Sequence, residues 1–194
     1  MDVDISQLSE FDIIRSSLTL VFVFISIIIG LRIISKYFEI KKKEFISVGL
    51  TLIFLSAPWW SNAFSFLSIL LFRYAFEAPE YLLLLNIGGP LGLIFWIYSF
   101  CKLIYPKSIN KIFIPILIIC SVYILYLLIF LFIDLNMIGY QVEDRLFDYK
   151  RALIPNIFAY VATISLVFTG TVFALKAIRS ENKELSWKGV FFMI

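Results

Sequence analysis

The sequence lacks histidine altogether and has only two cysteines among its 194 residues. Without histidine, the chain cannot form a Ser-His or Cys-His catalytic pair or a zinc site of the His-Glu-x-x-His kind. Cys101 and Cys120 both fall in apolar stretches, where a thiol usually behaves as a small buried hydrophobic side chain. We therefore expect no metal site, no cofactor and no enzyme activity.

Charged residues are also scarce, at 16% of the chain against about 25% in typical soluble proteins, whereas 61% of the residues are hydrophobic. The charges separate apolar runs of about 18 residues or more, each long enough for a helix to cross a bilayer core roughly 30 Å thick. The sequence therefore predicts an all-α, polytopic transmembrane helical bundle whose main partner is the lipid bilayer. Its five complete spans are Ile13–Ile34, Phe45–Phe72, Tyr81–Cys101, Ile112–Ile133 and Leu153–Leu175.

A sixth apolar run begins at about Leu185 and reaches Ile194 before it is long enough to cross. We interpret residues 1–194 as a single transmembrane domain, and we expect a fragment that lacks its C-terminal span or spans. The alternative for this last segment is a short interfacial helix anchored by Trp187. Small residues spaced four apart, such as Gly88 and Gly92, favour close helix packing, within the chain, with a partner helix or in a homo-oligomer.

The loop charges divide into two groups. The loops after the first, third and fifth spans carry 12 of the 17 Lys and Arg residues, whereas the N-terminus and the other loops carry 10 of the 14 Asp and Glu residues. Because short loops rich in Lys and Arg stay in the cytoplasm, we predict a multi-pass protein of the cell membrane with its N-terminus outside. No basic patch is interleaved with stacking aromatic residues, so we expect no nucleic-acid partner.

Two of the six prolines, Pro58 and Pro90, lie in the interior of predicted spans, beyond the first helical turn. An interior proline removes a backbone N–H and leaves a carbonyl without its helical partner. Pro90 follows Gly88 and Gly89, two residues that also weaken a helix. We therefore predict helix breaks at Pro58 and at Gly88, Gly89 and Pro90.

Three side chains near these breaks are candidates for ligand binding. At a rise of about 1.5 Å per residue, Trp59 and Trp60 lie near the outer interface, and Asn86 lies roughly 9 Å below it. Discontinuous helices at matched depth can line a ligand site, which favours Trp59, Trp60 and Asn86 as ligand-binding residues. Alternatively, the tryptophans anchor the interface, the glycines pack against neighbouring helices and Asn86 forms a hydrogen bond between helices.

Four features carry a resemblance to a known group of proteins: five spans with an external N-terminus and the start of a sixth, APWW in the second span, NIGGP in the third, and SENKELSWKGVFFMI near the C-terminus. In these features the chain resembles uncharacterised seven-span integral membrane proteins of archaea. Those proteins are in turn loosely similar to the seven-span N-terminal sensor region of membrane histidine kinases. The catalytic motifs of the kinases do not occur here, and the resemblance assigns no functional residue.

We therefore expect an integral membrane protein that acts as a non-catalytic sensor or interaction module, with a cavity around Trp59, Trp60 and Asn86. The alternative is a carrier of a neutral or apolar solute, in which the breaks at Pro58 and Gly88–Pro90 face each other across a cavity. The predicted spans contain no Asp, Glu or Lys, which argues against proton-coupled transport.

Overall fold

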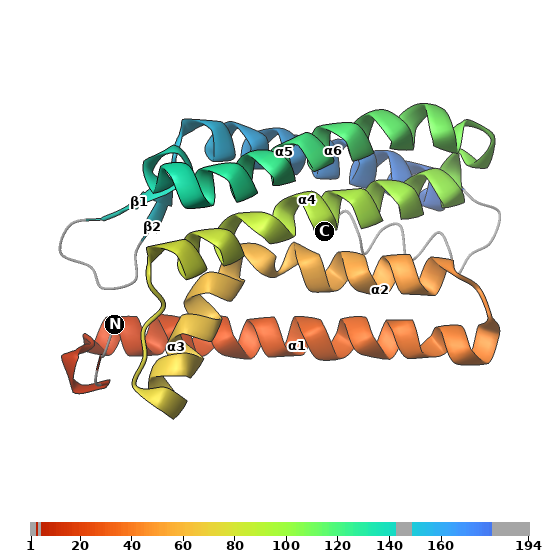
Figure 1. The fold of residues 1–194 in the computed structure, drawn as a ribbon. Coiled ribbons are helices and arrows are strands. Elements are labelled where there is room, and N and C mark those ends of the chain that lie inside the picture. The colour runs from red at the N-terminus through yellow and green to blue at the C-terminus, as the bar shows by residue number, and fades with distance from the viewer. Residues whose placement is uncertain (1–2, 4, 143–148, 180–194) are drawn as a thin grey trace.

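The fold is an antiparallel bundle of helices, seen in a computed structural model that describes residues 3, 5–142 and 149–179 (Figure 1). The predicted start of a sixth span and Trp187 lie outside the described residues. The helices are α1 (Glu10–Ile40), α2 (Glu44–Leu55), α3 (Trp60–Phe72), α4 (Ala78–Ile104), α5 (Ile109–Ile133) and α6 (Leu153–Ile178). Four 3-10 turns connect or precede them, namely η1 (Ile5–Gln7), η2 (Ala57–Trp59), η3 (Pro106–Ser108) and η4 (Leu135–Met137).

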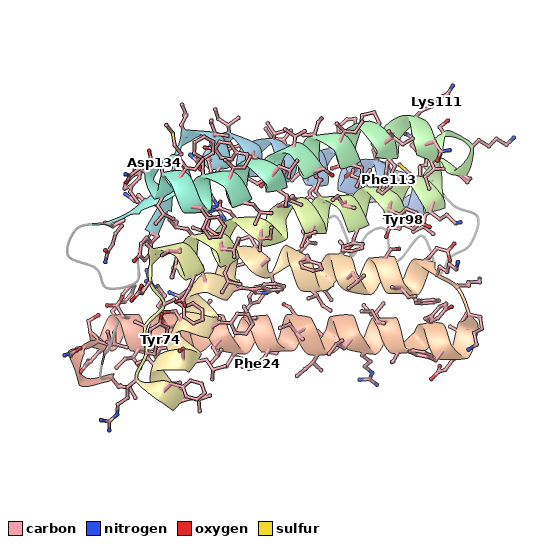
Figure 2. The ribbon with its side chains drawn as sticks, viewed as in Figure 1. Phe24, Tyr74, Tyr98, Lys111, Phe113 and Asp134 are labelled. Carbon is pink, nitrogen blue, oxygen red and sulfur yellow. The ribbon has the colours of Figure 1, made fainter. Side chains whose placement is uncertain are left out.

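Five helical segments are long and apolar enough to cross a membrane, and they match the five predicted spans. The second of them consists of α2, η2 and α3 together. Large apolar side chains face outward, as a lipid environment requires: Phe132 on α5 is 85% exposed, whereas Val23 on the inner side of α1 is fully buried. Lys111 and Asp134 lie at opposite ends of α5 (Figure 2). The prediction of an all-α membrane bundle is confirmed.

The connections alternate between two ends of the bundle (Figure 1). One end carries residue 3, the link between α3 and α4, and a short hairpin of β1 (Gly139–Gln141) and β2 (Tyr149–Arg151). We call it the hairpin end. The other end carries the α1–α2 turn, the α4–α5 turn and the last turn of α6, and we call it the basic end. The loops that the sequence groups by charge thus lie together in space.

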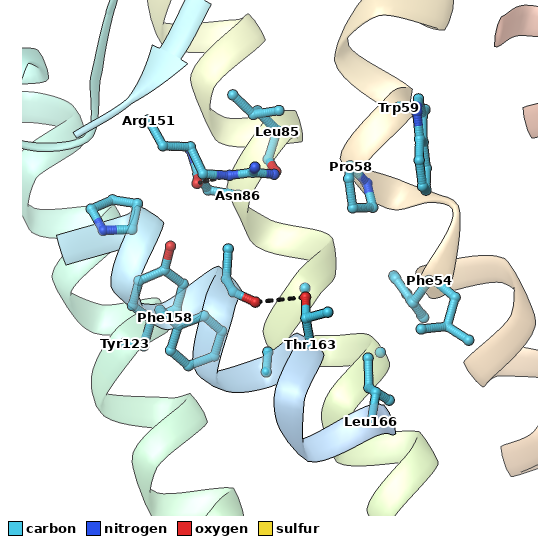
Figure 3. A pocket seen from close by; sticks show the side chains of 16 residues that line it. Phe54, Pro58, Trp59, Leu85, Asn86, Tyr123, Arg151, Phe158, Thr163 and Leu166 are labelled. Atoms are coloured by element: carbon cyan, nitrogen blue, oxygen red, sulfur yellow. Dashed lines mark hydrogen bonds between the residues drawn. The ribbon is translucent and has the colours of Figure 1, made fainter. Parts of the chain in front are cut away.

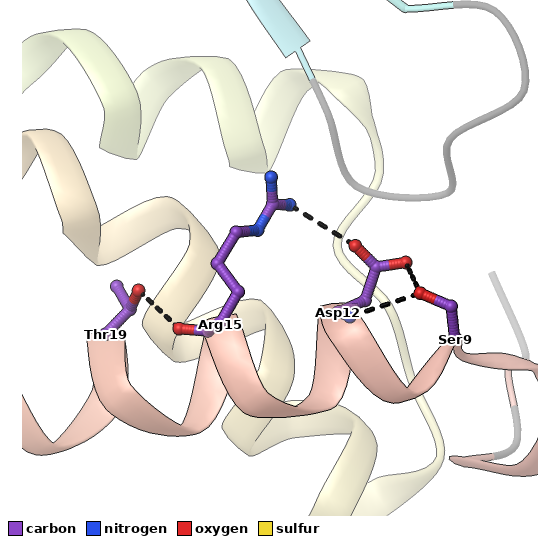
Figure 4. Close-up of polar contacts among 4 residues, drawn as sticks. All are labelled: Ser9, Asp12, Arg15 and Thr19. Carbon is purple, nitrogen blue, oxygen red and sulfur yellow. Dashed lines mark hydrogen bonds and ion pairs between the residues drawn. The ribbon is translucent and has the colours of Figure 1, made fainter.

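The start of α1 shows how the first span tolerates a charged residue. Ser9 caps the helix by accepting a hydrogen bond from the backbone N–H of Asp12, at 3.1 Å from nitrogen to hydroxyl oxygen (Figure 4). The carboxylate of Asp12 in turn lies 3.8 Å from Nη2 of Arg15, one turn further into the helix. Arg15, which falls inside the predicted first span, is therefore paired with an acid at the hairpin end.

The second span is interrupted where the sequence predicts it, at Pro58. α2 ends at Leu55, and Pro58 occupies the first turn of η2, where its missing N–H is least needed. The hydroxyl of Ser56 donates to the carbonyl of Ile53 at 2.7 Å, and the N–H of Trp59 donates to the carbonyl of Ser56 at 3.1 Å. The chain then continues as α3 in a new direction, crossing α1 (Figure 1).

The third span is continuous, so the predicted break at Gly88, Gly89 and Pro90 is wrong. α4 runs from Ala78 to Ile104 with Pro90 inside it. A Cβ atom on Gly88 would overlap the Cβ of Ala57, and one on Gly92 would lie 3.3 Å from the backbone of Phe54. These two glycines let α4 pack directly against the turn around Pro58. The predicted packing face of Gly88 and Gly92 is confirmed.

Candidate functional site

A cavity of about 350 Å³ lies between α4 and α6, bordered on one side by the end of α2 and η2 (Figure 3). Most of its lining is apolar, and it includes aromatic rings, two prolines and two glycines. Different elements supply these residues: Phe54, Pro58 and Trp59 come from α2 and η2, Asn86, Gly89 and Gly92 from α4, and Pro155, Phe158, Ala162 and Leu166 from α6.

The polar corner of the cavity is formed by Arg151 and Asn86 (Figure 3). Nε of Arg151 donates to the side-chain oxygen of Asn86 at 3.1 Å, and Nη2 donates to the backbone carbonyl of Leu85 at 3.0 Å. The amide nitrogen of Asn86 donates to the carbonyl of Leu82 at 2.8 Å. Asn86 is only 4% exposed, so this amide connects the guanidinium group firmly to α4.

The hairpin determines where Arg151 lies. Gly139 on β1 pairs with Arg151 on β2, and the next N–H, that of Ala152, donates to the carbonyl of Ile138 at 2.9 Å. Lys150, one position earlier on the strand, is exposed, because successive side chains of a strand point to opposite faces. The strand therefore points Arg151 toward the bundle and Lys150 toward the solvent.

Burial makes the guanidinium of Arg151 unusual. Desolvation lowers its pKa from the ordinary value, with the nearby phenol groups of Tyr123 and Tyr81 acting in the opposite direction. An arginine nonetheless keeps its charge in a protein. Within the part of the chain that the structure describes, its hydrogen-bond partners are a neutral amide and a neutral carbonyl, and no carboxylate pairs with it. The cavity thus has one partly buried positive charge at its hairpin end.

The sequence-predicted residues divide at this site. Trp59 lines the cavity, is 47% exposed and packs edge-to-face on Phe22 at 5.2 Å between ring centroids. Trp60 does not line it, since its indole N–H donates to the hydroxyl of Ser56 at 3.0 Å and its ring packs against Phe54. The structure therefore brings Trp59 and Asn86 to one cavity, whereas Trp60 packs against Phe54 and does not line it. Gly89 also lines the cavity, and a Cβ there would meet no atom within 4 Å.

Toward the basic end the cavity stops at a tightly packed region. Its deepest lining residues are Gly92 on α4 and Leu166 on α6. Beyond them, the indole N–H of Trp96 donates to the hydroxyl of Thr169 at 2.7 Å and joins the two helices. The apolar cluster below includes Leu93, Ile97, Phe100 and both cysteines, which are fully buried as predicted for small hydrophobic side chains.

Sequence reasoning missed Arg151, which it counted only as an external loop charge. Residues 5–142 and 149–179 contain no group of three or more His, Cys, Asp or Glu side chains arranged to hold a metal ion. The chain finds no match among protein-family models, curated proteins or solved structures. The resemblance to seven-span archaeal proteins and to the sensor region of histidine kinases therefore stays a prediction.

Proposed function

We propose that this protein is a non-catalytic sensor or interaction module of the cell membrane, with its N-terminus outside, that holds a small ligand in the cavity beside Arg151. The observation that carries the proposal is the shape of the cavity. It lies toward the hairpin end, has a polar corner at Arg151 and Asn86, and ends at the packed region around Trp96 and Thr169. A receptor needs access from one side only.

The charge distribution supports the proposed orientation. Among the described residues, the basic end carries most of the Lys and Arg side chains, including Lys41, Lys42 and Lys43 in the α1–α2 turn, and loops rich in these residues stay in the cytoplasm. The cavity then faces the outer half of the bilayer, where an external or membrane-borne ligand reaches it.

A carrier of a neutral or apolar solute is the weaker alternative. It requires two helix breaks that face each other across the cavity, so that the site opens to either side in turn. α4 continues through Pro90, and Gly88 packs against Ala57 instead of lining the cavity. The hydrogen bond between Trp96 and Thr169 further opposes passage toward the basic end.

Cysteine accessibility tests both the orientation and the one-sided access. Cys101 and Cys120 are replaced by alanine, and single cysteines are introduced at Gly89 in the cavity, at Ser108 in the α4–α5 turn and at Gln141 in the hairpin. A membrane-impermeant thiol reagent is then added to sealed vesicles of each orientation.

We expect the cysteines at Gly89 and Gln141 to react only from the outside and the cysteine at Ser108 only from the cytoplasmic side. Reaction at Gly89 from both sides would favour the carrier. Reaction at Gly89 from neither side would contradict a cavity that is open to the outer solvent, and exchanged reactivity at Ser108 and Gln141 would reverse the orientation.

A further inference from the structure

We propose that the cavity binds a single-chain amphiphile with a carboxylate head, a molecule of the fatty-acid class. The carboxylate contacts the guanidinium of Arg151, and the apolar chain lies between α4 and α6. This inference rests on the proposed function, because it names the kind of ligand that the same cavity receives.

The first argument is the charge of Arg151. A guanidinium group has five N–H donors, and the hydrogen bonds to Asn86 and Leu85 use two of them. Among the described residues no carboxylate pairs with this charge, whose burial is costly without an opposite charge, and a carboxylate is the group whose geometry matches the arginine donors. Because Asn86 and the hairpin already fix the side chain, a carboxylate at this corner meets donors that need no reorganisation.

The second argument is the apolar character of the rest of the cavity. Beyond the corner, the walls are formed by Phe54, Phe158, Ala162 and Leu166. The ring of Phe158 is stacked on Tyr123 at 3.8 Å between centroids and is therefore held in place. A free inorganic anion or a sugar would gain nothing from these walls, whereas an alkyl chain is stabilised by about 0.8 kcal/mol for each buried CH₂ group.

The third argument is size and access. A volume of about 350 Å³ is near the lower limit of known ligand cavities, which range from about 300 to 1,000 Å³. That space suits one alkyl chain and is too small for the two chains of a membrane phospholipid. The space next to Gly89 on α4 is open, and Trp59 at the edge of the cavity is half exposed. An amphiphile can therefore enter from the surrounding lipid.

The test compares two matched probes, 12-bromododecanoic acid and 12-bromododecanol, whose bromine quenches tryptophan fluorescence on contact. The full chain is placed in nanodiscs of neutral phosphatidylcholine at pH 9, where the acid is ionised. We expect saturable quenching by both probes, with half-saturation at an about tenfold lower concentration for the acid, as charge-assisted hydrogen bonds predict.

Four variants assign the effect to the site. Arg151→Gln should raise the half-saturating concentration of the acid to that of the alcohol, whereas Lys150→Gln, which removes a charge from the exposed face of the same strand, should leave it unchanged. Gly89→Leu should abolish saturable quenching by both probes, because the new side chain occupies the cavity. Arg151→Lys, which keeps the charge, should lie between the wild type and Arg151→Gln, and it replaces that variant if Arg151→Gln does not fold.

The outcomes separate this inference from the proposed function. Equal binding of acid and alcohol to the wild type would overturn the assignment of a carboxylate while leaving a ligand cavity in place. Absence of saturable quenching by either probe would overturn the inference as a whole. The accessibility of the cysteine at Gly89 would still decide the proposed function independently.

Discussion

The segment α2–η2–α3 and the helix α4 each contain an interior proline, and they respond to it differently. At Pro58 the helix ends and a 3-10 turn redirects the chain, whereas at Pro90 the helix continues for another 14 residues to Ile104. Each proline lacks a backbone N–H and so removes one helical hydrogen bond. The difference between the two segments must therefore come from the residues around each proline.

The surroundings of the two prolines differ in their polar groups. Near Pro58, the hydroxyl of Ser56 bonds to the carbonyl of Ile53 and accepts the indole N–H of Trp60, which stabilises the end of α2. Pro90 releases the carbonyl of Asn86, four residues earlier. The side chain of Asn86 and the guanidinium of Arg151 bond to the carbonyls of Leu82 and Leu85 in the same turn, which reinforces α4. A proline weakens a helix locally, and the contacts of the neighbouring residues determine whether the helix ends or continues.

The largest effect is expected where the two segments touch. Gly88→Ala would place a Cβ on top of the Cβ of Ala57, and we expect it to lower the free energy of unfolding by about 3 kcal/mol through overpacking. Gly89→Ala is the matched control, because its Cβ meets open space and alanine favours a helix by about 1 kcal/mol over glycine. Unfolding in mild detergent measures both. Equal destabilisation would show that the close contact of Gly88 with Ala57 does not stabilise the fold.

A smaller effect is expected when the reinforcement of α4 is removed. Asn86→Leu deprives Arg151 of an acceptor and should cost about 1 to 2 kcal/mol, since it leaves a partly buried charge less satisfied. Asn110→Leu, at an exposed position of α5, should stay within about 0.5 kcal/mol.

Spin labels at Glu80 and Lys102 would report the end-to-end distance of α4, which we expect to shorten in Asn86→Leu as the helix bends at Pro90. An unchanged distance would mean that the polar groups contribute stability without controlling the shape.

The smallest effect concerns the corner where the bent segment joins α4. The hydroxyl of Tyr74 donates to the carboxylate of Glu80 at 2.8 Å, and this hydrogen bond raises the pKa of Tyr74 to about 12. Because the pKa is raised, the hydrogen bond contributes fully to the stability of the folded state below the ordinary pKa of about 10. This contribution is lost as the pH rises toward 12.

Tyrosinate absorbance, taken as the difference between the wild type and Tyr74→Phe, measures this titration. Glu80→Gln should return the midpoint toward 10. A midpoint near 10 in the wild type would show that the corner is not held by this bond.

The sequence was sufficient for the features that depend on local pattern. Apolar runs gave the five spans, loop charges grouped the connections correctly in space, and the spacing of Gly88 and Gly92 indicated a packing face. The interruption at Pro58 was also predicted, because an interior proline removes a backbone N–H, although the same reasoning was wrong at Pro90.

The remaining features depend on contacts between distant segments. The residues that contact α4 around Pro90 include Ala57 and Arg151, which lie about 30 and 60 residues away from Pro90 in the sequence. Arg151 itself belongs to a run of mixed charges, and only its pairing with Gly139 decides that it points inward while Lys150 points outward. The opposite roles of Trp59 and Trp60 likewise depend on the turn geometry of η2.

The position of Arg151 connects the hairpin to both α4 and α6. The residue ends β2, and α6 begins two positions later at Leu153, with the N–H of Ala152 tied to Ile138 between them. The side chain that bonds to Asn86 and to the carbonyl of Leu85 on α4 therefore belongs to the segment that leads directly into α6. Three segments that are far apart in the sequence, the hairpin, the middle of α4 and the start of α6, are thus joined within a few residues of one another.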